Sequence, residues 1–189
     1  MEIRTRSGNI YSYNKQTGEI LGGSISAQLP KWNFAPFVPF ESMPQVDSFI
    51  LGLTEQCNLR CTYCCYSGNY VNKRSHNTVS MGTDDVDDIL LFIDSFTSNR
   101  PIKIFLYGGE PLLNYNIVQY AIEESRKQWD NDVSFTISTN GTTLTKERID
   151  WLVANNVVLA LSIDGTKPFH DSYRVDAQGN GSYTRVYDA

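Results

Sequence analysis

Four short apolar runs alternate with helix-like segments along most of the chain, and this alternation constrains the fold more than any other feature. The runs are SFILGLT (48–54), IKIFLYG (102–108), VSFTIST (133–139) and VVLALSI (157–163). Near-continuous apolar strands separated by helices are typical of a parallel sheet whose outer side is covered by helices through right-handed crossovers. We therefore predict an α/β fold in which the four runs are parallel strands of a sheet or barrel.

The segments between the runs carry the signals of helices. A hydroxyl cap at Thr83, followed by two carboxylates, predicts a helix start. The apolar residues after it recur at the spacing of one helix face: Val86, Ile89, Leu90 and Ile93. A second helix is expected over 114–129 and a third after Thr145, and the final GSYTRVYDA (181–189) is typical of the start of a fourth.

Residues 1–47 do not follow this alternation and are expected to form a separate N-terminal region. Short β-prone stretches at 10–13 and 19–21 flank a turn, which predicts a β-hairpin. The following SAQLPKWNFAPFVPFESMP contains four prolines, which exclude a regular helix, and four aromatic anchors. We predict an extended connector packed against a main domain at 48–189, with peptide binding by the aromatic residues as the alternative.

The composition is that of an ordinary folded enzyme or binding domain, with 41% hydrophobic and 20% charged residues. The formal net charge of -5 is mild and not segregated, which disfavours nucleic acids and anionic membranes as partners. The sequence has neither the apolar core of a signal peptide nor an apolar run of about 18 residues, the length that a membrane span requires. A cytoplasmic location is therefore expected.

All four cysteines lie between positions 57 and 65, directly after the first predicted strand. Cys57, Cys61 and Cys64 have the spacing C-x3-C-x2-C, and in a reducing compartment such thiols favour a metal or cluster over disulfides. A four-iron cluster held by three thiolates keeps one iron open, which indicates catalysis. A structural zinc site is an alternative, although no second ligand pair follows. A thioredoxin-like use of CTYC would leave Cys57 without a role.

The other unusual motifs also follow predicted strands: YGGEP (107–111), STNGT (138–142) and SIDGT (162–166). The carboxyl ends of parallel strands meet at one edge of a sheet or barrel, where active sites form. We therefore expect these motifs and the cysteines to form one site. Each motif taken alone also has a simpler explanation as a turn, because Asn-Gly and Asp-Gly pairs favour turns.

Taken together, these motifs resemble the radical S-adenosylmethionine superfamily. CNLRCTYC, with Tyr63 before the last cysteine, resembles its cluster loop, and FLYGGEPLL is similar to its glycine-rich methionine-binding motif. STNGTTLT with LSIDGTKPFHDSYR resembles the peptide- and protein-modifying branch, which includes anaerobic sulfatase maturases and maturases of ribosomally made peptides. The resemblance covers roughly 48–189 and implies a partial (β/α) TIM-type barrel.

The same resemblance implies that the chain is truncated at its C-terminus. Only about four of the six parallel β/α units of the family's barrel are predicted here, and no cysteine follows Cys65 to bind auxiliary clusters. Such a chain is expected to bind the cofactors but to be inactive on its substrate when alone.

The resemblance also implies a role for each site residue. Cys57, Cys61 and Cys64 would hold a [4Fe-4S] cluster whose fourth iron chelates S-adenosylmethionine. Contacts to that cofactor would come from Arg174 in HDSYR, whose fork of donors could reach a carboxylate, and from residues at the strand ends: Gly108, Gly109, Glu110, Ser138, Asn140, Ser162 and Asp164. The two glycines would let the backbone approach the methionine moiety, and Glu110 would pair with its ammonium group.

Several residues near these motifs receive no role. Cys65 is expected to be a small buried residue or a spare thiol and not a cluster ligand. His76 and His170 are expected in loops, without partners that would make them metal ligands or bases. The polar loop at 70–77 is a candidate lid over the cofactor. No catalytic residue is identified.

The implied reaction is reduction of the cluster, reductive cleavage of S-adenosylmethionine to methionine and a 5'-deoxyadenosyl radical, and hydrogen abstraction from a substrate carbon. The implied partners are a precursor peptide or protein substrate and a reductant such as flavodoxin or ferredoxin. Peptide maturation is the predicted function. Protein oxidation of the sulfatase-maturase type and a non-catalytic metal-binding scaffold are the alternatives.

Overall fold

The structure, a computed structural model, describes residues 2–4, 8, 10–13, 20–22, 46–68, 70, 75–96, 101–129 and 132–189. The chain divides into two compact units, Met1–Glu41 and Ser42–Ala189. The predicted Pro- and aromatic-rich connector lies outside the described residues, as does part of the loop at 70–77.

The N-terminal unit contains a three-stranded antiparallel sheet of order β1-β2-β3. Its strands are β1 Glu2–Arg4, β2 Ile10–Tyr13 and β3 Ile20–Leu21. β2 pairs with β3, so the predicted hairpin is confirmed. β1, which the sequence analysis did not predict, pairs with the other side of β2.

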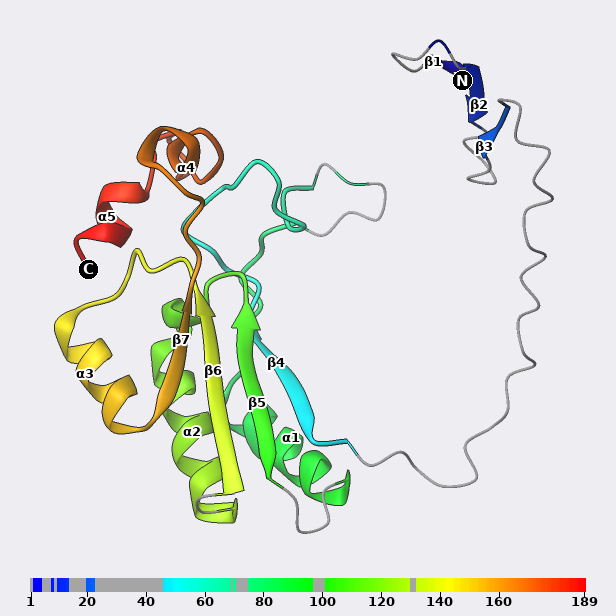
Figure 1. Cartoon of the computed structure of the whole chain (residues 1–189). Coiled ribbons are helices and arrows are strands. Elements are labelled where there is room, and N and C mark those ends of the chain that lie inside the picture. Colours follow the sequence, from blue (N-terminus) through cyan, green and yellow to red (C-terminus); the bar gives the residue numbers. More distant parts are fainter. Residues whose placement is uncertain are drawn as a thin grey trace. The chain divides into compact units, whose positions relative to one another are not determined.

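The main unit is built on a parallel sheet of order β4-β5-β6-β7 (Figure 1). Its strands are β4 Ser48–Thr54, β5 Ile102–Gly108, β6 Val133–Thr139 and β7 Val157–Leu161. The predicted α/β fold with four parallel strands is confirmed. β7 ends at Leu161 and not at residue 163, so Ser162 belongs to the loop that follows.

Three helices, α1 Thr83–Phe96, α2 Tyr115–Trp129 and α3 Lys146–Ala154, accompany the sheet (Figure 1). Their apolar faces and the sheet share one core, whose members include Leu53, Leu90, Ile93, Ile104, Leu106, Ile122, Phe135, Ile137 and Leu152. Alternate residues of β5, among them Phe105 and Tyr107, are exposed instead. The helices therefore bury one face of the sheet.

Shorter helices lie near the carboxyl ends of the strands. η1 Pro111–Asn114 joins β5 to α2, and α4 Lys167–Tyr173 and α5 Tyr183–Tyr187 follow β7. α4 was not predicted from the sequence. A Thr166 cap position with Pro168 in the first turn was the available signal, since proline is well tolerated there.

The N-cap residue of α3 is the predicted one, whereas that of α1 lies one residue before the predicted position. Thr145 caps α3 as predicted, and its hydroxyl accepts from the Arg148 amide at 3.3 Å. At α1 the cap is Gly82 and not Thr83, because the Gly82 carbonyl accepts from the Val86 amide at 3.3 Å. The Gly82 amide in turn donates to the Asp85 carboxylate at 2.8 Å, so a carboxylate in the first turn replaces the expected hydroxyl.

No helix within the described residues combines the length and the hydropathy that a membrane crossing requires.

Adjacent leucines on α1 allow the core assignment to be tested. Leu90 is 3% exposed and Leu91 is 67% exposed. Leu90→Ala is expected to lower the free energy of unfolding by about 2–5 kcal/mol, because it leaves a cavity between α1 and the sheet. Leu91→Ala should change it by less than about 0.5 kcal/mol. Urea unfolding of the two variants measures both values, and equal losses would contradict the assignment of the buried helix face.

Candidate functional site

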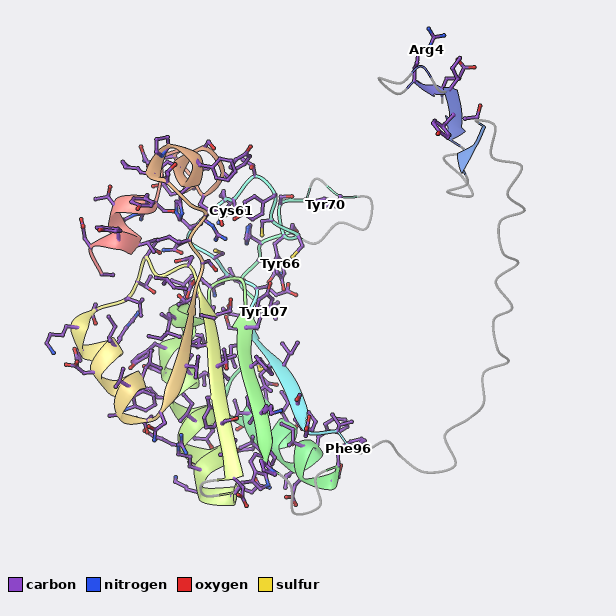
Figure 2. The ribbon with its side chains drawn as sticks, viewed as in Figure 1. Arg4, Cys61, Tyr66, Tyr70, Phe96 and Tyr107 are labelled. Carbon is purple, nitrogen blue, oxygen red and sulfur yellow. The ribbon has the colours of Figure 1, made fainter. Side chains whose placement is uncertain are left out.

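The candidate site is a pocket of about 300 Å³ at the carboxyl ends of the parallel strands. Its lining comes from the last residues of β5 and β6 and from the segments that follow the four strands: Cys57, Leu59, Cys61, Tyr63, Cys64, Cys65, Tyr66, Tyr107, Gly108, Gly109, Ser138, Thr139, Asn140, Ser162 and Arg174. Figure 2 shows three of these side chains, Cys61, Tyr66 and Tyr107, at this end of the sheet. The structure thus brings together most of the residues that the sequence analysis selected.

The cysteine loop places several N–H groups near its sulfur atoms. The Leu59 amide donates to Cys57 Sγ at 3.4 Å, and the Tyr66 amide donates to Cys64 Sγ at 3.4 Å. The side-chain amide of Asn140 donates to Cys57 Sγ at 3.8 Å. Donors directed at sulfur stabilise thiolates and tune iron–sulfur clusters, so this loop is chemically suited to hold a cluster.

All four cysteines are free thiols. Burial raises the pKa of Cys57 and of Cys64, and it raises the pKa of Cys61 to about 11, although the charge of Arg174 lowers that value. The thiols are therefore protonated at neutral pH until a cation compensates the thiolate charge, as is general for metal ligands. Cys65 is exposed, which rules out the expected burial of its side chain.

Among the described residues, no three His, Cys, Asp or Glu side chains are grouped as ligands of one metal ion. A four-iron cluster does not require ligands grouped around one ion, because each cysteine binds a different iron atom.

Gly108 and Gly109 line the pocket, and both pack their backbone against the end of β4 and the residues directly after it. A Cβ atom on Gly108 would lie 2.3 Å from the Thr54 carbonyl oxygen, and one on Gly109 would lie 2.2 Å from that of Gln56. Gly108 also has a φ of 141°, which disfavours any residue with a side chain. The Gly109 amide donates to the Thr54 oxygen at 2.7 Å. The glycines are thus needed for the approach of β5 to the cysteine loop.

Glu110 is fully buried and its carboxylate is held by protein donors. Oε1 accepts from the Leu112 amide at 3.0 Å and from the Thr139 hydroxyl at 2.7 Å, and Oε2 accepts from the Asn140 amide at 2.7 Å. Burial holds the pKa of Glu110 above its ordinary value, although these hydrogen bonds offset part of the increase. Glu110 is not among the residues that line the pocket, and its side chain connects β5 to β6. Its predicted contact with the cofactor's ammonium group stays a prediction.

Asn140 connects β6 to the cysteine loop. Its Nδ2 donates to Asn58 Oδ1 at 3.0 Å, and its Oδ1 accepts from the Thr142 hydroxyl at 2.7 Å. Asn58 Nδ2 donates to that same hydroxyl at 2.8 Å, which closes the ring. Asn58 and Thr142 were not predicted as site residues, and their only sequence signal was their place inside the CNLRC and STNGT motifs.

Asp164 and Arg174, predicted as separate cofactor contacts, form an ion pair with each other. Arg174 Nε donates to Oδ2 at 2.8 Å, and Nη2 donates to Oδ1 at 3.2 Å. The Tyr63 hydroxyl also donates to Oδ2, at 2.5 Å. Burial raises the pKa of Asp164, but the hydrogen bonds from Arg174 and Tyr63 outweigh it and hold the pKa below its ordinary value. Arg174 and Tyr63 line the pocket.

A parallel β/α sheet that gathers three thiols, two obligatory glycines and an arginine at its strand ends defines a cofactor-dependent enzyme site. The model of the Radical SAM superfamily matches residues 51–189, and the chain belongs to this superfamily. Its members use a [4Fe-4S] cluster and S-adenosylmethionine, as the sequence motifs implied.

Two curated relatives are sulfatase-maturating enzymes. The chain is 29% identical over 147 residues to the cysteine-type anaerobic sulfatase-maturating enzyme of Clostridium novyi (strain NT), which is 76% of this chain and 39% of that protein. It is 32% identical over 135 residues to the serine-type anaerobic sulfatase-maturating enzyme of Bacteroides thetaiotaomicron, which is 69% of this chain and 32% of that protein. The predicted closeness to anaerobic sulfatase maturases is confirmed.

A solved structure of native anSMEcpe with bound AdoMet and Cp18Cys peptide superposes with a TM-score of 0.64 at 25% identity. The match covers 75% of this chain and 38% of that one. The chain thus spans about two fifths or less of the length of these relatives.

Replacing the cysteines one at a time tests which of them hold the cluster. Alanine at Cys57, Cys61 or Cys64 is expected to abolish the charge-transfer absorbance after anaerobic reconstitution with iron and sulfide, because each removes one iron ligand. Cys65→Ala is the matched control and should keep both absorbance and iron content. Equal loss in the Cys65 variant would disprove the three-ligand assignment.

Glu110→Ala is expected to destabilise the apo protein by about 2–5 kcal/mol, because it leaves three buried donors without their acceptor. Glu123→Ala on α2 is the control, since Glu123 is exposed. Urea unfolding under anaerobic reducing conditions measures both. A Glu110 variant as stable as the control would show that the carboxylate does not brace the strand ends.

Proposed function

We propose that the chain holds a [4Fe-4S] cluster through Cys57, Cys61 and Cys64 and binds S-adenosylmethionine in the adjoining pocket to modify a peptide or protein. One observation carries the proposal: the three thiols line the same pocket as the glycine pair and Arg174. The cluster and S-adenosylmethionine would together supply a carbon-centred radical that removes hydrogen from the substrate.

The chain's own residues bind and orient the cofactor in this proposal. Gly108 and Gly109 expose backbone groups to the pocket, and Ser138 and Ser162 add hydroxyl groups from neighbouring strand ends. Arg174 offers a guanidinium group, whose planar fork suits the carboxylate of an amino acid. Asn140 directs an amide donor to the sulfur of Cys57 and so orients one cluster ligand.

The substrate class is proposed from the relatives. A peptide is bound in the solved anSMEcpe structure that superposes on the chain. Modification of a peptide, such as the crosslinking of a precursor, is therefore the proposed activity. Sulfatase maturation is the second candidate, because the two curated relatives carry that activity in their names. A flavodoxin or ferredoxin would supply electrons in both cases.

The proposed function predicts that the reconstituted chain binds S-adenosylmethionine and slowly releases 5'-deoxyadenosine when dithionite is added. Anaerobic calorimetry and chromatography measure the two quantities, and the Cys61→Ala variant is the control that should do neither. A chain that holds four irons but does not bind S-adenosylmethionine would overturn the proposal.

Deuterated peptides separate the two substrate candidates. A synthetic sulfatase peptide labelled at the β-carbon of its target cysteine or serine is offered to the reconstituted chain together with dithionite. The chain alone is expected to cleave the cofactor without taking deuterium from the peptide. Transfer of deuterium to 5'-deoxyadenosine would favour the sulfatase-maturase candidate and would contradict the expected inactivity on substrate.

A further inference from the structure

His170 is fully buried in α4, where the sequence analysis had expected a loop residue without a partner. Its Nδ1 accepts from the Asp164 amide at 3.2 Å. A ring nitrogen that accepts from an amide carries no proton, so the neutral ring has its proton on Nε2. Nε2 lies 2.9 Å from Ser182 Oγ, and that hydroxyl donates to the Arg174 carbonyl at 2.9 Å.

These contacts form a chain of hydrogen bonds, here called the relay, in which every donor is determined. The Ser182 hydroxyl donates its proton to the Arg174 carbonyl, so Ser182 Oγ accepts from His170 Nε2. The relay therefore begins at the Asp164 amide and ends at the Arg174 carbonyl. These are the backbones of the same two residues whose side chains form the ion pair beside the pocket.

The ion pair in turn positions the cysteine loop. The Tyr63 hydroxyl donates to Asp164, and the Arg174 guanidinium carbon lies 5.4 Å from the centre of the Tyr63 ring. The Thr62 amide donates to the Tyr173 carbonyl at 3.0 Å. Tyr63 lies between two of the proposed cluster ligands. The backbone around α4 and the cysteine loop are therefore joined in two ways, directly through Thr62 and Tyr173 and through the side-chain contacts of Asp164.

The surroundings of His170 favour its neutral form. Burial lowers the pKa of the ring, and the charges of Arg174 and Lys167 lower it further, while Asp164 and Asp171 raise it, with a net decrease. The ring of Tyr183 packs against it edge-on at 5.5 Å. If Nδ1 were protonated, its N–H group would face the N–H group of Asp164. The hydrogen bond between them would be lost, and the relay would be broken.

We infer that His170 is a positioning residue for the binding of S-adenosylmethionine. His170 acts through the Asp164 amide and Ser182, and these contacts hold Arg174 and Tyr63 in place at the pocket. The inference rests on the proposed function, because it concerns the same pocket. His170 touches neither the cofactor nor the cluster in this role. Loss of the relay should therefore weaken cofactor binding without removing a cluster ligand.

The tautomer of His170 can be measured without any cofactor. Nitrogen-15 NMR of the apo chain is expected to show a neutral His170 with its proton on Nε2 at neutral pH. The chain has 2 histidines, so a His76→Gln variant assigns the signals. A proton on Nδ1, or a charged ring, would overturn the relay.

Two serine variants test the effect on cofactor binding. Ser182→Ala removes the acceptor for Nε2 and is expected to raise the dissociation constant for S-adenosylmethionine about tenfold, with iron content unchanged. Ser172→Ala is the matched control on α4, because Ser172 is exposed and its hydroxyl donates to the Phe169 carbonyl instead. It should bind like the wild type.

The outcomes separate this inference from the proposed function. Wild-type affinity in Ser182→Ala, or a lower unfolding temperature with unchanged affinity, would overturn the positioning role while leaving the proposed function intact. A wild-type chain that holds iron but does not bind S-adenosylmethionine would overturn the proposed function itself. His170→Asn keeps an acceptor for the Asp164 amide, so it should lose less affinity than His170→Ala; equal loss would contradict the inference.

Discussion

The geometry of the strand ends depends on the hydrogen bonds that the buried carboxylate of Glu110 accepts. A carboxylate in a protein interior is costly unless its oxygens are satisfied, and here three donors from η1 and the end of β6 satisfy them. The Glu110 amide also donates to the Gln56 carbonyl at 2.8 Å, in the segment that leads into the cysteines. One residue thereby fixes the ends of three strands relative to one another, and the pocket is the space that this arrangement leaves.

The glycine pair makes the same arrangement possible from the other side. Side chains at Gly108 and Gly109 would collide with backbone oxygens of Thr54 and Gln56, and backbone cannot move aside as a flexible side chain can. The close approach also allows the Gly109 amide to bond to Thr54. The motif GGEP therefore has two structural roles: its glycines allow the close approach of the backbones, and Glu110 connects the strand ends. Any contact of its backbone with a cofactor is additional to these roles.

The sequence predicted the strands, the larger helices and many of the residues that line the pocket, but not how the polar side chains pair. The strands were predictable because apolar runs such as 48–54 and 133–139 are local signals. The partner of Glu110 at Asn140 is 30 residues away, and the partner of Asp164 at Tyr63 is 101 residues away. Such pairings depend on register and side-chain direction, which motif spacing does not encode. α4 was missed because it has seven residues, too few for an apolar period.

The ion pair of Asp164 with Arg174 differs from ordinary surface pairs in what it connects. Its side chains are 24% and 15% exposed, so water screens it less than a pair on an open surface. The same carboxylate oxygen that receives Arg174 Nε also receives the Tyr63 hydroxyl, and the amide of Asp164 is bonded to His170. A displacement of Asp164 would therefore move a pocket arginine and the cysteine loop together. Hydrogen bonds thus join the loop after β7 to the cysteine loop, although about 100 residues separate them in the chain.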